Sequence, residues 1–241
     1  MRLLINNIVL LLLFLSGTAL KADAWDEYWD LITKYKNIKS IKGTIITNYY
    51  LENANKISKI ETGEFIINQN KKWLNYGNII LLNNDKFQIT IDKVNKYVML
   101  NKANTKEEVD KIISGIKPIT KDSLINLRKI VQMNQSTNAN GDKLFEMIFP
   151  KDYAYKKIDL QFTSHGIFSK MIYEFNRNKD KAYPYKVEII YKRLILNSTI
   201  VPEEFSEKKI LTIKGNDVKL LDNYSAYKLL DYRKLQMNSK K

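Results

Sequence analysis

The chain has 241 residues, 44% of them hydrophobic, and a formal net charge of +14. The absence of cysteine excludes disulfides and a lipid-bearing N-terminal cysteine, and the single histidine excludes the common zinc sites. Only 5 of the 40 basic residues are arginine, so the charge favours solvated lysines over a nucleic-acid site, with a weak attraction to anionic membranes as the functional remainder.

Residues 1–24 have the features of a secretion signal. Arg2 provides a positive start, residues 8–15 form an apolar run, and Ala22-Asp23-Ala24 fits the small-x-small pattern of a cleavage site. The apolar run is too short to span a bilayer as an anchor. We therefore expect cleavage after Ala24 and a soluble protein exported to the periplasm.

Hydrophobic periodicity predicts one helix followed by many strands. Residues 25–36 have the spacing of an amphipathic helix, whereas the period changes to two after Gly43. Short turns such as Asn83-Asn84-Asp85 separate the strands, which is typical of antiparallel pairing. Two further helices are expected at 105–114 and 121–133, before a polar connection at 134–142. The predicted strands cover 41–51, 58–68, 72–76, 78–82, 86–91, 94–100, 143–149, 155–163, 167–175, 185–196, 208–214 and 218–221.

These elements predict a single α+β domain, predominantly β, over residues 25–232. About ten or eleven of these strands are expected to form an antiparallel sheet, as either a flattened sandwich or a strongly curved sheet, and the amphipathic helices favour the curved sheet with the helices covering its concave face. Residues 233–241 are expected to form a disordered tail.

The sequence offers no clear catalytic constellation. His165 lies in Ser164-His165-Gly166, a segment expected to form a hairpin turn, and the eight glycines are never close enough to form a phosphate-binding loop. The carboxylate pairs Glu107-Glu108 and Glu203-Glu204 are interpreted as a helix start and as loop charges. We therefore expect no enzyme activity, no cofactor and no metal.

Large apolar side chains recur at alternate strand positions and could line either a packed core or a cavity. A few short helices cannot cover a whole curved sheet, so we expect an apolar ligand cavity on the concave face. Phe87, Ile89 and Ile91 are placed on that face, and Ile89→Glu is expected to leave the protein folded while ligand binding falls. The candidate cavity residues are Phe65, Ile67, Trp73, Phe87, Ile89, Ile91, Leu124, Leu127, Val131, Phe145, Met147 and Phe162.

Four segments follow one another in an order known from a protein family: Gly63-Glu64-Phe65, the aromatic stretch 72–76, Asn84-Asp85-Lys86-Phe87, and residues 197–205. With the signal segment, this order resembles the LolA family of periplasmic lipoprotein carriers and its LolB-like relatives. The chain has Asn70-Lys71-Lys72 where that family has an arginine that latches its lid.

The resemblance implies a half-barrel that carries lipid or lipoprotein acyl chains, a chaperone for protein transport across the periplasm. Its implied partners are an inner-membrane transporter and an outer-membrane receptor, and it would act as a monomer without nucleic acid. A non-enzymatic interaction protein of the cell envelope with a filled core is the alternative. A cavity of roughly 300 Å³ or more would favour the carrier over that alternative.

Overall fold

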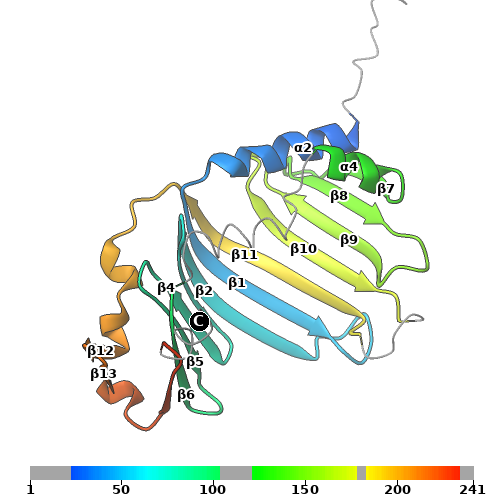
Figure 1. Cartoon of the computed structure of the whole chain (residues 1–241). Helices are drawn as coiled ribbons and strands as arrows, with labels where there is room; N and C mark the ends of the chain where they lie inside the picture. The colour runs from blue at the N-terminus through cyan, green and yellow to red at the C-terminus, as the bar shows by residue number, and fades with distance from the viewer. Residues whose placement is uncertain (1–22, 104–120, 178–182, 234–241) are drawn as a thin grey trace, which may run out of the picture.

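The structure, a computed structural model, describes residues 23–103, 121–177 and 183–233. These residues form a large curved sheet that does not close on itself, with two short helices over one end of its concave face (Figure 1). The helices are α2 (Ala24–Lys34), which continues as a 3₁₀ turn at Tyr35–Asn37, and α4 (Lys121–Arg128). In the described part of the chain, no helix is long and apolar enough to cross a membrane.

Twelve strands make up the main sheet, in the order β14-β6-β5-β4-β3-β2-β1-β11-β10-β9-β8-β7, and β12 and β13 form a separate hairpin. All neighbours in the main sheet are antiparallel except β14 and β6. The strands are β1 (Ser40–Tyr50), β2 (Lys59–Asn68), β3 (Lys71–Tyr76), β4 (Ile79–Asn83), β5 (Phe87–Asp92), β6 (Tyr97–Lys102), β7 (Gln132–Thr137), β8 (Lys143–Ile148), β9 (Tyr155–Phe162), β10 (Phe168–Phe175), β11 (Lys186–Leu196), β12 (Leu211–Lys214), β13 (Asp217–Leu220) and β14 (Lys228–Asp231).

The curved antiparallel sheet with few helices confirms the predicted architecture, but the described residues hold 14 strands rather than ten or eleven. The polar connection predicted at 134–142 is wrong, because its first residues belong to β7. This strand lies at the sheet edge, where its polar side chains remain in water and hide the apolar alternation expected of a strand. Helix α4 ends at Arg128, five residues earlier than expected. The helix predicted at 105–114 and most of the predicted signal and tail lie outside the described residues.

Helix α2 packs its apolar side against the concave face of the sheet. Asp23 caps its start by accepting a hydrogen bond from the Trp25 backbone N–H at 3.0 Å, and the Asp23 carboxylate also pairs with Arg128 of α4. Trp25 and Leu31 are buried beneath the helix. Cleavage after Ala24, which stays a prediction, would remove this cap.

Two hydrophobic cores lie on opposite faces of the one sheet. Residues paired across strands share a face. Following the cross-strand partners from Ile91 through the sheet leads to Lys170 and then to Leu144, so these three side chains lie on one face. Phe145 and Leu160 are partners of each other and lie on the opposite face. The inner core, under α2 and α4, therefore lies on the concave face; it contains Trp25, Leu31, Leu124, Val131, Phe145, Met147, Leu160 and Phe162.

The outer core lies between the convex face of β4–β6 and the C-terminal segment that contains β12 and β13 (Figure 1). Seven of its side chains are almost fully buried: Leu82, Ile89, Ile91, Val98, Leu100, Ile210 and Leu211. The C-terminal segment thus supplies the second layer that this part of the sheet needs on its outside.

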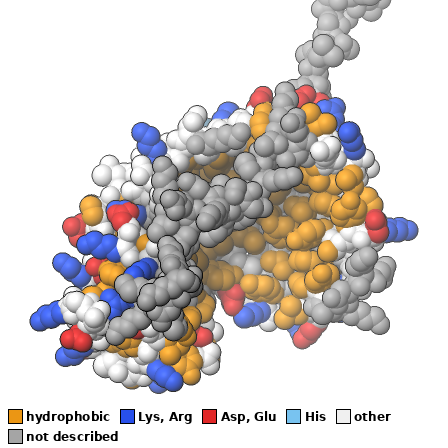
Figure 2. All heavy atoms as spheres, viewed as in Figure 1, with side chains coloured by type: hydrophobic (Ala, Val, Ile, Leu, Met, Phe, Trp, Pro, Cys, Tyr) orange, Lys and Arg blue, Asp and Glu red, His pale blue; other side chains and the backbone are white. Residues whose placement is uncertain are grey.

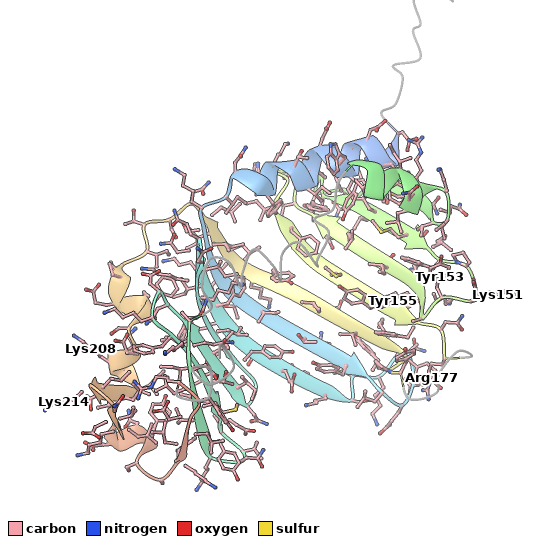
Figure 3. The ribbon with its side chains drawn as sticks, in the orientation of Figure 1. Lys151, Tyr153, Tyr155, Arg177, Lys208 and Lys214 are labelled. Atoms are coloured by element: carbon pink, nitrogen blue, oxygen red, sulfur yellow. The ribbon has the colours of Figure 1, made fainter. Side chains whose placement is uncertain are left out.

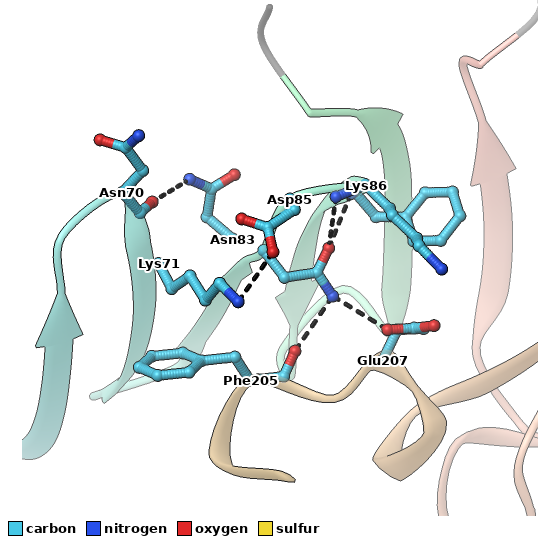
Figure 4. A network of polar contacts seen from close by, with 9 residues as sticks. Asn70, Lys71, Asn83, Asp85, Lys86, Phe205 and Glu207 are labelled. Atoms are coloured by element: carbon cyan, nitrogen blue, oxygen red, sulfur yellow. Dashed lines mark hydrogen bonds and ion pairs between the residues drawn. The ribbon is translucent and has the colours of Figure 1, made fainter. Parts of the chain in front are cut away.

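Asn84 joins the C-terminal segment to the turn between β4 and β5. Figure 4 shows Phe205 and Glu207 of that segment beside Asp85 and Lys86 of the turn. Its side-chain oxygen accepts from the backbone N–H groups of Lys86 and Phe87 at 2.9 and 2.8 Å. Its amide nitrogen donates to the Phe205 carbonyl at 3.0 Å and to a Glu207 carboxylate oxygen at 2.9 Å. One side chain therefore both shapes the turn and holds the segment that covers the outer core.

We expect Asn84→Asp to lower the free energy of unfolding by about 2 kcal/mol, because it removes both donors and places a carboxylate beside Glu207. Urea unfolding followed by circular dichroism measures the change. The control is Asn83→Asp, since Asn83 donates only one exposed hydrogen bond, to the Asn70 carbonyl. Equal losses in the two variants would show that Asn84 does not hold the C-terminal segment.

Candidate ligand-binding face

The middle of the concave face carries apolar side chains that belong to neither core. They come from β10, β11, β1, β2 and β3, and the register places them on the same face as the inner core. All are half-buried, and Figure 2 shows hydrophobic side chains gathered over this hollowed face. We call this set the concave patch; it consists of Ile45, Phe65, Leu74, Tyr173, Val187, Ile189 and Tyr191.

A row of aromatic rings connects the concave patch to the inner core. The ring centroids of Phe65 and Tyr191 are 6.2 Å apart, those of Tyr191 and Phe168 5.3 Å, and those of Phe168 and Phe162 5.2 Å. Phe162 in turn lies 5.8 Å from Phe145, with the two rings edge to face. Tilted and edge-on packing of this kind is favourable for aromatic rings. The row forms a continuous apolar floor from β2 to the space beneath α2.

An apolar hollow of about 230 Å³ lies where this floor meets α2. Tyr28 and Ile32 of the helix and Tyr35 of the 3₁₀ turn after it form one side of the hollow. Burial raises the pKa of Tyr28 and of Tyr35, so both hydroxyls stay neutral at physiological pH. The sheet forms the other side with Leu160, Phe162, Phe168 and Met171.

The hollow is smaller than the 300 to 1,000 Å³ that is typical, roughly, of pockets enclosing a drug-sized ligand. It can take the end of a flexible chain, and the rest of such a ligand would lie along the concave patch. The hollow and the concave patch together therefore offer an extended apolar track that is open to solvent along part of its length.

A polar cluster borders the concave patch on β1–β3. The Tyr49 hydroxyl donates to Glu61 at 3.0 Å and lies 3.2 Å from the Tyr76 hydroxyl, while Lys59 pairs with Glu61 at 2.6 Å. Burial and the contacts with Tyr76 and Glu61 raise the pKa of Tyr49, and the hydrogen bond from Lys59 lowers the pKa of Glu61. The cluster thus presents neutral tyrosines and a paired carboxylate beside the apolar surface.

The convex face behind β7–β11 has a different character. A groove of about 460 Å³ there is lined by both polar and apolar side chains, and Lys157 on its wall lies within 3.5 Å of carboxylate oxygens of Glu146, Asp159 and Glu174. Burial disfavours the charge of Lys157, but these carboxylates outweigh it and raise its pKa. The charges in this groove are matched within the protein. Among the described residues, no group of histidine and carboxylate side chains could hold a metal ion.

The structure divides the predicted cavity residues among three places. Phe65 lies in the concave patch, and Ile67 shares its face of β2. Leu127 packs against the inner core. Leu124, Val131, Phe145, Met147 and Phe162 are at most 7% exposed and form that core, with Phe162 also lining the hollow.

The placement of Trp73, Phe87, Ile89 and Ile91 on the concave face is wrong. They belong to the outer core, where Ile89 and Ile91 are 0% exposed beneath the C-terminal segment. The alternation along β5 was predicted correctly, but alternation alone does not reveal which face turns towards the helices. Gln88, Thr90 and Asp92 are the β5 side chains on the concave face.

Several residues of the apolar track were not among the predicted ones, notably Val187, Ile189 and Tyr191 of β11. The alternation of residues 185–196 contained this signal. Tyr28 and Tyr35 were visible in the sequence as part of an amphipathic helix, and only the fold shows that they form one wall of the hollow.

No protein-family model matches the sequence, and no curated protein is similar to it. Solved structures with a related outline include an uncharacterized conserved protein from Thermus thermophilus, with a TM-score of 0.46, 4% identity, and coverage of 87% of this chain and 99% of that one. Another is the Mycobacterium tuberculosis lipoprotein LppX, with a TM-score of 0.43, 7% identity, and coverage of 74% of this chain and 97% of that one. A third is a DUF1329 family protein from Desulfovibrio piger, with a TM-score of 0.33, 7% identity, and coverage of 78% of this chain and 99% of that one. With every TM-score below 0.5, neither family nor function follows from these likenesses.

Proposed function

We propose that the protein is a non-enzymatic binder or carrier of lipid acyl chains. The observation that supports this function is the apolar track formed by the concave patch and the hollow beneath α2. A chain laid along such a track gains about 0.8 kcal/mol for each methylene group removed from water, so its affinity needs no specialised polar chemistry. The polar cluster around Tyr49 and Glu61 would face the polar end of an amphiphile.

The proposal includes a cellular setting that the resemblance to LolA-like carriers suggests. The chain would be exported to the periplasm, act there as a soluble monomer, and move lipid or lipoprotein acyl chains between membranes. An inner-membrane transporter and an outer-membrane receptor would be its partners. The lid latch would differ from that of the family, because Lys71 pairs with Asp85 at 2.7 Å in the segment where the family has an arginine.

Native mass spectrometry of the protein, purified without detergent, is expected to reveal bound lipid. A titration with a fluorescent fatty acid should then give saturable binding that unlabelled fatty acid competes away. Binding of this kind is expected because the track can desolvate an alkyl chain. A protein that is consistently empty and does not bind the fluorophore would refute the carrier function.

A second candidate is an interaction protein of the cell envelope with a filled interior. The small volume of the hollow favours it, because about 230 Å³ is below the size expected of a dedicated carrier cavity. This candidate predicts no lipid in the mass spectrum and no competition in the titration, so the same experiment separates the two functions.

A further inference from the structure

The turns at the strand ends remote from α2 form one connected edge of the molecule. They comprise residues 51–58, 77–78, 93–96 and 149–154 and, between β10 and β11, residues 176–177 and 183–185. Asn176 donates to the Lys151 carbonyl, Arg177 donates to the Leu51 carbonyl at 3.5 Å, and the Tyr185 N–H donates to the Tyr50 carbonyl at 2.8 Å. We call this edge the strand-end rim; Lys151, Tyr153 and Arg177 lie along it in Figure 3.

Apolar side chains are unusually exposed at the strand-end rim. Of the 12 large hydrophobic side chains that are exposed in the described part of the chain, seven lie in these turns or at the strand ends beside them. Val94 is 65% exposed and Ile57 is 41% exposed. The other five are Leu51, Ile60, Ile79, Tyr97 and Tyr185. A cluster of exposed apolar side chains is unfavourable in water. It therefore indicates a surface that contacts another apolar partner, such as the interior of a membrane.

The strand-end rim is also basic. The basic residues of its turns are Lys56, Lys93, Lys96, Lys151 and Arg177, whereas the acidic residues are only Glu52 and Asp152. The turns at the opposite strand ends, residues 69–70, 84–86, 138–142 and 163–167, carry more acidic than basic side chains, with Lys86 against Asp85 and Asp142. The excess positive charge therefore complements a negatively charged surface at one end of the sheet.

Cations and tyrosines are combined at this end. The Arg177 guanidinium lies 4.1 Å from the Tyr185 ring centroid, and the Lys186 ammonium lies 3.9 Å from that of Tyr50. The two other cation–π contacts of the described residues, Lys59 with Tyr49 and Lys228 with Tyr97, lie at the same strand ends. Tyrosine rings and long cations are the side chains that settle at the boundary between lipid tails and water.

A second row of rings leads from the strand-end rim into the concave patch. The centroids of Tyr153 and Phe149 are 6.0 Å apart, those of Phe149 and Tyr155 6.0 Å, and those of Tyr155 and Tyr173 5.7 Å. Tyr173 belongs to the concave patch. The apolar surface is therefore continuous from the edge of the molecule to its concave face.

We propose that the strand-end rim docks the protein on a bilayer surface that contains anionic lipid. Leu51, Ile57 and Val94 enter the headgroup region, while Lys56 and Lys151 approach the lipid phosphates. Apolar insertion together with electrostatic attraction is what holds peripheral proteins on such surfaces. Docking is independent of acyl-chain binding by the concave patch, although it would bring the open end of that patch to the lipid.

Co-sedimentation of the protein with lipid vesicles tests the proposal. The protein is used as it is recovered from cells, without further truncation. We expect binding to vesicles of phosphatidylcholine and phosphatidylglycerol, weakening as salt rises, and little binding to phosphatidylcholine alone. Lys56→Glu with Lys151→Glu should lower the partition coefficient by about 30-fold or more, since each lysine near an anionic surface contributes about fivefold. Lys208→Glu with Lys214→Glu, exposed on the C-terminal segment (Figure 3), makes the same change of charge away from the rim and should have a small effect.

A second pair of variants tests the apolar part. Ile57→Ser should weaken vesicle binding several-fold at every salt concentration, and Val201→Ser, whose side chain is more exposed but remote from the rim, should not. No binding to anionic vesicles, or equal losses in each variant and its control, would overturn the proposal. The fluorescent fatty-acid titration without vesicles is expected to be unchanged in the rim variants, so a failure of docking is distinguishable from a failure of ligand binding.

Discussion

Ile89→Glu is expected to abolish cooperative folding. Ile89 is 0% exposed in the outer core, where Leu82, Leu100 and Leu211 are equally closed to solvent. A carboxylate there loses its hydration without gaining a partner, which costs several kcal/mol, and the lost packing costs about 2 to 5 kcal/mol more. The sum is comparable to the whole stability of a typical domain, about 5 to 15 kcal/mol. This replaces the expectation of a folded variant that the sequence alone suggested.

Thermal melts followed by near-ultraviolet circular dichroism measure the effect. The matched control is Thr90→Glu, one residue along the same strand, because Thr90 is half-buried on the concave face and a carboxylate there retains contact with water. A folded Ile89→Glu protein with a melting transition near that of the parent would show that the C-terminal segment does not cover β5.

Ile189→Glu should leave the protein folded and lower its affinity for fatty acid by about tenfold or more. Ile189 is half-buried in the concave patch, between Met171 of β10 and Thr47 of β1. Water can reach a carboxylate at this position in the free protein, whereas a bound alkyl chain would exclude that water. Fluorescence titration gives the affinity, and a thermal melt confirms that the variant is folded.

The control for this prediction is Ile190→Glu, the next residue of β11, whose side chain lies on the convex face opposite Lys170. It introduces the same charge into the same strand and should keep the parent affinity. If Ile189→Glu binds as well as the parent, or if the two variants lose affinity equally, acyl chains do not bind on the concave patch.

The alternation of side chains along each strand could be predicted from the sequence. Which of the two alternating sets faces the helices could not. Alternation along residues 87–91 separates Ile89 and Ile91 from Gln88 and Thr90, as the structure has them. Which set faces the helices depends on pairings with residues more than a hundred positions away, such as Thr47 with Ile189. A period of two contains no information about those pairings.

Long-range contacts also join segments that were noticed separately. The turn at Asn84 and the connection that ends at Phe205 were both singled out in the sequence, and the hydrogen bond from Asn84 to the Phe205 carbonyl brings them together. Neither segment shows by itself that it has the other as partner. The same holds for Tyr35 in the 3₁₀ turn after α2, whose hydroxyl donates to the Gly166 carbonyl at 3.3 Å.

The two cores on opposite faces give the sheet an uneven stiffness. The inner core braces the sheet around β8–β10 from within, and the outer core braces β4–β6 from outside. Between these braced halves, β1 and β11 pair along most of their length, from Ile41 and Leu196 to Tyr50 and Lys186. Among the described residues, neither core includes a side chain of β1 or β11. The spacing of the two halves of the concave face is therefore set by backbone pairing in the middle of the sheet, and not by packing that the two cores share.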